Sequence, residues 1–196
     1  MNKSKTSNRG KVFVISGPAG AGKTTLINRL EKEFPHKVVE SISCTTRKKR
    51  VGEESKKHYY FLSRAEFIEL KNGGAFLEWA EVFGNLYGTL KSEVDRICHA
   101  GKHAFLVIDV QGAEQLMGRI QANFIFISPP SMEELRSRLE SRHTESREAI
   151  EERLKWAKEE LAKSCDFDYT ICNNDLETAY EELKTLCGLV NQDGEK

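Results

Sequence analysis

Short apolar runs alternate along the chain with longer segments of helical periodicity. Three of these runs, at residues 12–16, 103–109 and 123–128, are rich in β-branched and aromatic residues, as buried parallel strands are. Two shorter runs, at 58–62 and 169–172, are predicted as further strands. Strands that alternate with helices indicate an α/β fold with a mainly parallel central sheet. In such a sheet, ligands bind at the carboxyl ends of the strands.

The helices are predicted from apolar spacing and from their caps. A helix that begins near Lys23 carries its apolar residues on one face. Ser63 and Ser131 are each followed three residues later by glutamate, which is the pattern of a capping box at the start of a helix. The second of these helices opens a long charged helical stretch that runs to about residue 163, and a last helix begins near residue 175.

Composition limits the class of protein. The chain has 196 residues, enough for one domain with a sizeable core. Lysine plus arginine and aspartate plus glutamate both number 30, a balance that argues against a general nucleic-acid binder. No apolar run approaches the roughly 18 residues of a membrane span, and the polar N-terminus predicts no secretory signal. The five cysteines include no C-x-x-C pair, so neither a disulfide framework nor a zinc site is expected. We therefore expect a cytoplasmic protein that binds neither nucleic acid nor membranes.

The sharpest motif is GPAGAGKT at residues 17–24, which fits the phosphate-loop pattern G-x-x-x-x-G-K-[ST]. An apolar strand precedes it and an amphipathic helix follows, which is the context that the motif requires. Its glycines let backbone N–H groups point at phosphate oxygens, and the helix N-terminus adds a positive dipole. Lys23 is placed to reach the β- and γ-phosphates, and Thr24 to hold Mg²⁺. The loop alone does not distinguish a GTPase, an ATPase and a kinase.

A second candidate site is the basic stretch ISCTTRKKRVGEE at residues 42–54. It contains four adjacent cations: Arg47, Lys48, Lys49 and Arg50. From the residues alone, four interpretations stay open: a solvated loop, a nuclear-import signal, a nucleic-acid patch, or a clamp for one small anion.

Six blocks of sequence narrow the choice: SISCTTRKKRVGE, HYYF, FLEWAEVFGNLYGT, IDVQG, FIFISPPS, and RLESRHTE followed by IEERL. In this order and spacing they resemble the guanylate kinases, and the resemblance runs from Lys11 to the last helix. It implies a phosphate-loop NTPase-type three-layer fold, and the transfer of the γ-phosphoryl group of ATP to GMP, and to dGMP, with Mg²⁺.

The resemblance also implies a division of the chain. Flexible tails are expected at 1–9 and 191–196, and one domain at 10–190. Within this domain we expect a core (10–40, 92–135 and 157–190), a GMP-binding lobe (41–91) and a helical lid (136–156). The lobe is also the segment where strands and helices stop alternating.

For GMP, the resemblance implies one set of contacts to the base and another to the phosphate. Carboxylates accept from the guanine N–H donors, and hydroxyl or basic side chains donate to guanine O6; the residues at these positions are Glu78, Asp109, Ser43, Thr89 and Arg47. The phosphate is held by residues suited to a dianion: Arg47, Arg50, Tyr59 and Tyr87. Glu53 is expected to orient an arginine or to lie near the site. Lys48 and Lys49 are expected to face solvent.

For ATP, the resemblance implies contacts from the loop and from the lid. The loop contacts are Gly17, Pro18, Ala19, Gly20, Ala21, Gly22, Lys23, Thr24 and Thr25. Arg138 matches the position that packs on adenine, and Asn173 matches an adenine contact. The moving phosphoryl group is surrounded by cations: Lys23, Arg47, Arg142 and Arg153. Taken alone, the lid arginines would be an ordinary charged helical surface; together they match the lid that closes over ATP and excludes water.

The chain departs from the family pattern at five positions: Lys49, Lys56, His58, Val107 and His143. Lys49 stands where proline is usual, Lys56 and His143 stand where glycine is usual, and His58 stands where aspartate is common. Val107 replaces an acidic residue that is common two residues before Asp109. Metal handling is therefore the part of the transfer most open to change.

Two other functions stay open. Guanylate-kinase-like domains also serve as non-catalytic modules that bind phosphorylated peptides, typically with a degraded phosphate loop, whereas this loop is intact. A nucleotide kinase for another base is the second alternative. The enzyme is expected to be a monomer or a homodimer.

Overall fold

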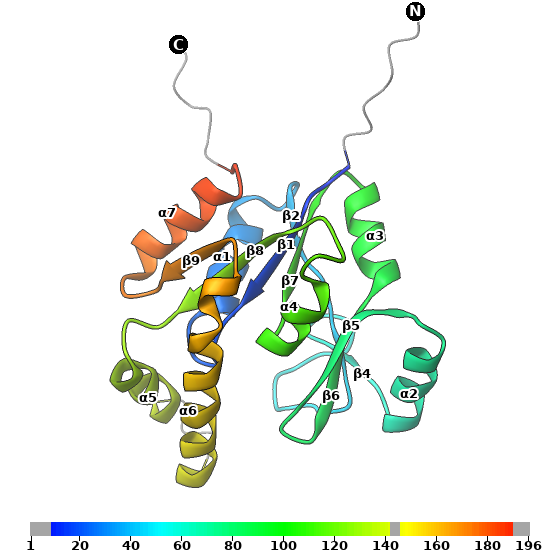
Figure 1. Cartoon of the computed structure of the whole chain (residues 1–196). Coiled ribbons are helices and arrows are strands. Elements are labelled where there is room, and N and C mark those ends of the chain that lie inside the picture. The colour runs from blue at the N-terminus through cyan, green and yellow to red at the C-terminus, as the bar shows by residue number, and fades with distance from the viewer. Residues whose placement is uncertain (1–8, 142–145, 190–196) are drawn as a thin grey trace, which may run out of the picture.

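The structure is a computed structural model that describes residues 9–141 and 146–189. Its centre is a five-stranded parallel sheet with the strand order β2-β7-β1-β8-β9 (Figure 1). The strands are β1 (Val12–Ser16), β2 (Val38–Glu40), β7 (His103–Val107), β8 (Asn123–Ser128) and β9 (Tyr169–Cys172). Because β1 is the middle strand, the loop that follows it emerges at the centre of the sheet's carboxyl edge.

Helices cover both faces of this sheet. Phe13 and Ile15 of β1 pack with α1 and α7 on one face, whereas Val14 packs with α3 and α4 on the other. Neighbouring residues of a strand point to opposite faces, so a strand covered on both sides is apolar throughout. The helices are α1 (Lys23–Glu33), α3 (Lys91–His99), α4 (Val110–Leu116) and α7 (Leu176–Leu186). The expected three-layer α/β fold is confirmed.

A second sheet of four strands has the order β4-β3-β6-β5 and a core of its own. The stacked rings of Phe67 and Phe76, with centroids 4.4 Å apart, lie in this core. β5 and β6 form an antiparallel hairpin whose turn consists of Phe83 and Gly84. The expected capping box is present at Ser63. The elements are β3 (Cys44–Thr45), β4 (Tyr60–Phe61), α2 (Arg64–Asn72), β5 (Phe76–Val82) and β6 (Asn85–Leu90).

Two further helices, α5 (Met132–Glu140) and α6 (Arg147–Ala162), pack against each other through buried leucines and isoleucine. They extend beyond the edge of the central sheet, on the side of the β5–β6 hairpin (Figure 1). A short 3-10 helix, η1 (Ser164–Asp166), follows α6 and precedes β9. Among the described residues, no helix is long and apolar enough to cross a membrane.

Several elements differ from their predicted extents. The strand predicted at 58–62 is reduced to Tyr60–Phe61, because the chain before it turns at Lys56, which has a φ of 66°. The strand predicted at 103–109 ends at Val107, because Asp109 caps α4. The apolar pattern does not predict the short strands β2 and β3, the β5–β6 hairpin, α3 or α4. The division into core, lobe and lid stays a prediction.

Candidate active site

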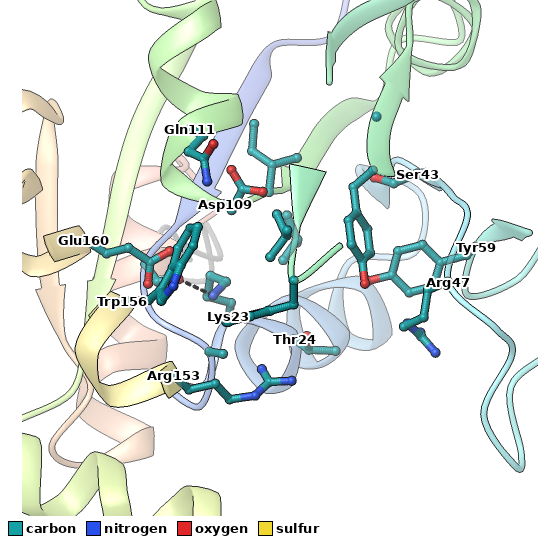
Figure 2. A pocket seen from close by; sticks show the side chains of 18 of the residues that line it. Lys23, Thr24, Ser43, Arg47, Tyr59, Asp109, Gln111, Arg153, Trp156 and Glu160 are labelled. Atoms are coloured by element: carbon teal, nitrogen blue, oxygen red, sulfur yellow. Dashed lines mark hydrogen bonds between the residues drawn. The ribbon is translucent and has the colours of Figure 1, made fainter. Parts of the chain in front are cut away.

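A cavity of about 270 Å³ opens at the carboxyl edge of the central sheet, between the loop after β1, the second sheet and α6. Figure 2 shows its two sides: Lys23, Arg153, Trp156 and Glu160 lie together on one side, and Arg47, Tyr59 and Ser43 lie on the other. Many of the expected site residues line it: Gly17, Ala19, Lys23, Thr24, Ser43, Arg47, Arg50, Tyr59, Glu78, Tyr87, Asp109 and Arg153.

Other expected residues do not line this cavity: Pro18, Gly20, Ala21, Gly22, Thr25, Glu53, Thr89, Arg138 and Asn173. Several of them support residues that do, as the contacts below show. Arg142 and the departure at His143 lie outside the described residues.

The phosphate loop is shaped by close approaches of backbone. Gly17 has a φ of 130°, and a Cβ there would lie 2.1 Å from the carbonyl oxygen of Ile127. Gly22 has a φ of 101° and precedes the first residue of α1. Lys23 folds over the loop, and its Nζ donates to the carbonyl oxygens of Gly17 and, at 3.0 Å, of Pro18. The loop therefore places an ammonium group and a helix N-terminus beside the cavity.

The side chain of Asn173 holds the phosphate loop through a hydrogen bond. Its Nδ2 donates to the carbonyl oxygen of Ala21 at 2.8 Å, and a Cβ on Gly22 would lie 2.1 Å from the same nitrogen. Arg138 donates to the Asn173 carbonyl at 3.0 Å and to Glu134 at 2.9 Å. The Asn173 side-chain amide is thus already bonded to the loop, and the adenine contacts of Arg138 and Asn173 stay predictions.

Arg47 is held by Glu53 in a two-point ion pair, with nitrogen–oxygen distances of 2.7 and 3.0 Å. The second oxygen of Glu53 also accepts from the Arg50 backbone N–H at 2.7 Å, and the Arg47 guanidinium lowers the pKa of the Glu53 carboxyl. The Arg47 side chain is only 14% exposed and lies 5.4 Å from the Tyr59 ring. Glu53 thus fixes the guanidinium and shapes the turn up to Arg50.

Tyr59 and Tyr87 lie near the ion pair of Arg47 and Glu53. The centroids of their rings are 6.1 Å apart in an edge-to-face arrangement, and burial raises the pKa of Tyr59. Lys48 and Lys49 are exposed and do not line the cavity, as expected. Of the four cations in the basic stretch, the cavity is therefore lined by Arg47 and Arg50.

Glu78, which is buried, and Asp109, which is half-buried, are carboxyls that line the cavity from different elements. Glu78 is 4% exposed, and burial raises its pKa to about 7. It lies opposite Thr89 in the β5–β6 hairpin, and a Cβ on Gly112 would be 2.5 Å from its Oε2. Asp109 accepts from the Gly112 N–H at 2.8 Å, and burial raises its pKa. The glycine of IDVQG therefore leaves room for Glu78 while its N–H is capped by Asp109.

Gln111, Trp156 and Glu160 also line the cavity, although the sequence interpretation does not include them. Burial raises the pKa of the Glu160 carboxyl, and the nearby Lys23 lowers it. Trp156 and Glu160 follow Arg153 by three and seven residues on α6, the spacing of one helix face. This periodicity is the signal that identifies them. Val107, which stands where the family commonly has an acidic residue, also lines the cavity.

Known proteins of similar sequence and structure identify the family of this chain. A family model of guanylate kinases matches residues 9–188. The guanylate kinase of Chlamydia felis (strain Fe/C-56) is 48% identical over 176 residues, which cover 90% of this chain and 86% of that protein. The guanylate kinase of Protochlamydia amoebophila (strain UWE25) is 47% identical over 178 residues, covering 91% and 90%. The crystal structure of guanylate kinase from Anaplasma phagocytophilum has a TM-score of 0.75 at 35% identity, over 95% of this chain and 88% of that one.

Fold and site together define a phosphate-loop nucleotide kinase: a phosphate loop at the end of the central strand shares one cavity with arginines and carboxyls. The relatives make the assignment more specific. The chain belongs to the guanylate kinase family.

Proposed function

We propose that this chain transfers the γ-phosphoryl group of ATP to GMP, forming ADP and GDP. Membership of the guanylate kinase family supports the reaction. The observation that supports the residue roles is the shared cavity. The phosphate loop lines one side of it, and Arg47, Arg50, Tyr59 and Tyr87 line the other. Two nucleotides bound at these sides would present their phosphates to each other, which is the geometry that in-line transfer needs.

Guanine binds beside Glu78 and Asp109, whose carboxylates accept from the base N–H groups, and Ser43 and Thr89 donate to O6. The burial of Glu78 supports selectivity, because a base without matching donors would leave a buried acceptor unpaired. Each such loss costs about 1–3 kcal/mol. None of these roles depends on the ribose 2′-hydroxyl, so dGMP is expected to be a substrate too.

The GMP phosphate binds to Arg47 and Arg50, with Tyr59 and Tyr87 donating from their phenols. This phosphate is largely a dianion at neutral pH, since its second pKa is about 6. The acceptor oxygen is therefore already ionised, and the transfer requires charge stabilisation rather than a general base. Lys23, Arg47 and Arg153 supply this charge, together with Arg142.

Mg²⁺ is proposed to bind at Thr24, with Asp109 lining the same cavity. The described residues include no group of three or more His, Cys, Asp or Glu side chains that could hold a metal alone. A hydroxyl and a nearby carboxylate suit Mg²⁺, which takes one or two protein oxygens and completes its shell with water and substrate phosphates. When bound, the ion neutralises charge on the β- and γ-phosphates.

The second sheet is proposed to act as the GMP-binding lobe and residues 136–156 as the lid over ATP, in a cytoplasmic enzyme. The five free cysteines, none of them in a disulfide, fit a reducing compartment. Whether the enzyme is a monomer or a homodimer would be measured by light scattering after size-exclusion chromatography.

A coupled assay of ADP release tests the function. At millimolar ATP and Mg²⁺, turnover is expected with GMP and dGMP, and little with AMP, CMP or UMP. Preference for another base would contradict the guanine site, and no turnover with any of the five would contradict the enzymatic function. In that last case, binding of a phosphorylated peptide would be measured, because guanylate-kinase-like domains also serve as non-catalytic modules that bind such peptides.

A further inference from the structure

The tip of the β5–β6 hairpin touches α6 across the cavity. The ring of Phe83 lies 5.3 Å from the ring of Trp156, with an angle of 50° between them. The Arg153 guanidinium carbon lies 5.0 Å from the centroid of the same phenylalanine ring. All three residues line the cavity, and Figure 2 shows Arg153 and Trp156 on the side of Lys23. A residue of the second sheet thus contacts an arginine on the opposite side.

The backbone of Phe83 is unfavourable for phenylalanine. The turn between Val82 and Asn85 has two residues, Phe83 with a φ of 48° and Gly84 with a φ of 73°. A two-residue hairpin turn with both φ values positive is type I′, which favours Asn-Gly. A bulky residue in the left-handed region is an outlier. The turn itself therefore gives no reason for phenylalanine, and the reason must lie in what the ring contacts.

Burial in a core does not supply that reason, since Phe83 is 37% exposed. The ring instead presents its face to a guanidinium, an arrangement that attracts a cation and limits its movement. Trp156, three residues after Arg153 on α6, packs against the same ring. The hairpin tip therefore has the geometry of a support for Arg153.

We propose that Phe83 is a positioning residue, which holds the Arg153 guanidinium at the cavity and makes its placement depend on the hairpin. The inference rests on the proposed role of Arg153 in phosphoryl transfer. When the β5–β6 hairpin packs against α6, the Phe83 ring contacts the Arg153 guanidinium and holds it at the cavity. When the second sheet moves away from α6, this contact is lost. Transfer is thereby linked to the position of the sheet that carries the proposed GMP contacts.

The test uses a substitution that suits the turn and removes the ring. Phe83→Asn should raise the Tm by about 2–4 °C, because Asn-Gly is the preferred pair of a type I′ turn. It should lower kcat about 10- to 100-fold, the effect of a small misplacement of a catalytic group. The KM values for GMP and ATP should change far less. Phe83→Tyr keeps the ring and should retain kcat close to that of the wild type.

Lys56→Asn is the matched control. Lys56 also has a positive φ, of 66°, and lies between β3 and β4, outside the lining of the cavity. Lys56→Asn should raise the Tm without lowering kcat. If it lowers kcat as much as Phe83→Asn does, relief of strain is the cause and the positioning role is overturned.

A double-mutant cycle separates this inference from the proposed function. If Phe83 acts through Arg153, Phe83→Asn should reduce kcat no further in an Arg153→Ala background. An active Arg153→Ala enzyme would overturn the proposed role of Arg153 and the inference with it. An impaired Arg153→Ala enzyme, with Phe83→Asn either harmless or fully additive, would overturn the positioning role and leave the proposed function standing.

Discussion

The two sides of the cavity, to which we assign the donor and acceptor phosphates, are built by different means. On the donor side, eight consecutive residues form a loop whose shape is set by glycine backbone and by packing against β8 and Asn173. On the acceptor side, side chains from a loop, two strands and the start of a helix are brought together: Arg47, Tyr59, Glu78, Tyr87 and Asp109. A donor site built from backbone is determined locally. An acceptor site built from side chains exists only once the second sheet has folded and lies against the first.

The cations of the two sides also differ in their partners. Lys23 Nζ donates to neutral carbonyl oxygens of its own loop, whereas Arg47 is paired with the carboxylate of Glu53. Lys23 also lies near two carboxyls, Glu160 and Asp109, whose pKa values are raised by burial and lowered by the charge of Lys23. The two-point ion pair with Glu53 fixes the direction of the Arg47 guanidinium. We therefore expect Arg47 to contribute geometry as well as charge.

The largest expected effect separates the donor side from the acceptor side. Lys23→Ala should lower kcat about 1,000-fold or more, as losing a cation from a phosphoryl-transfer site does. The Kd for GMP, measured by calorimetry, should stay within about twofold of wild type, because distant sites act independently. Lys32→Ala, on an exposed position of the same helix, is the control and should be active. Loss of GMP binding with intact turnover would place Lys23 on the wrong side.

The next effect tests the acceptor side. Arg47→Ala should lower kcat/KM for GMP about 10- to 100-fold, since a hydrogen bond to a charged group contributes about 1.5–3 kcal/mol. Arg50→Ala should have a smaller effect, because Arg50 is exposed and Glu53 fixes its backbone rather than its guanidinium. Steady-state kinetics with each substrate varied in turn measures both. An increase confined to the KM for ATP would contradict the assignment.

A smaller effect concerns the base. Glu78→Gln replaces an acceptor oxygen by a donor, so the ratio of kcat/KM for GMP to that for AMP should fall about 10-fold, the cost of one mismatched buried hydrogen bond. The coupled assay with both nucleotides gives this ratio. Glu81→Gln, exposed on the same strand, is the control. An unchanged ratio would show that guanine binds elsewhere.

The same substitution has a pH-dependent effect on stability. Burial raises the pKa of Glu78 to about 7 in the folded protein, so between the unfolded value and pH 7 the folded state binds more protons. Stability therefore falls as pH rises through this interval. Glu78→Gln should increase the free energy of unfolding by about 1–3 kcal/mol at pH 8, and the gain should shrink as pH is lowered towards 5. Denaturant unfolding at both pH values measures it; an equal gain at both would contradict the raised pKa.

The donor site could be predicted from the sequence because its strand, loop and helix are contiguous, and α1 begins at Lys23 as expected. The contacts that hold this loop could not, because Asn173 reaches Ala21 across 152 positions. The β5–β6 hairpin is not predicted either, because its turn contains phenylalanine where type I′ turns favour asparagine, so the usual turn signal is absent.

On the acceptor side, the residues alone leave the function of the basic stretch at residues 42–54 ambiguous. The family resemblance implies that Arg47 and Arg50 bind GMP, and the structure adds the ion pair with Glu53 and the room that Gly112 leaves for Glu78.

The smallest expected effect is also the sharpest test of the acceptor side. Replacing Lys48 and Lys49 together by alanine removes two positive charges from the basic stretch, twice the change made by Arg47→Ala. Both lysines are exposed and line no part of the cavity, so they act on GMP only through screened long-range attraction. The KM for GMP should therefore change less than about twofold at physiological ionic strength. If the lysine pair proves as damaging as Arg47→Ala, total charge rather than the geometry fixed by Glu53 attracts the acceptor, and the contrast between the two sides fails.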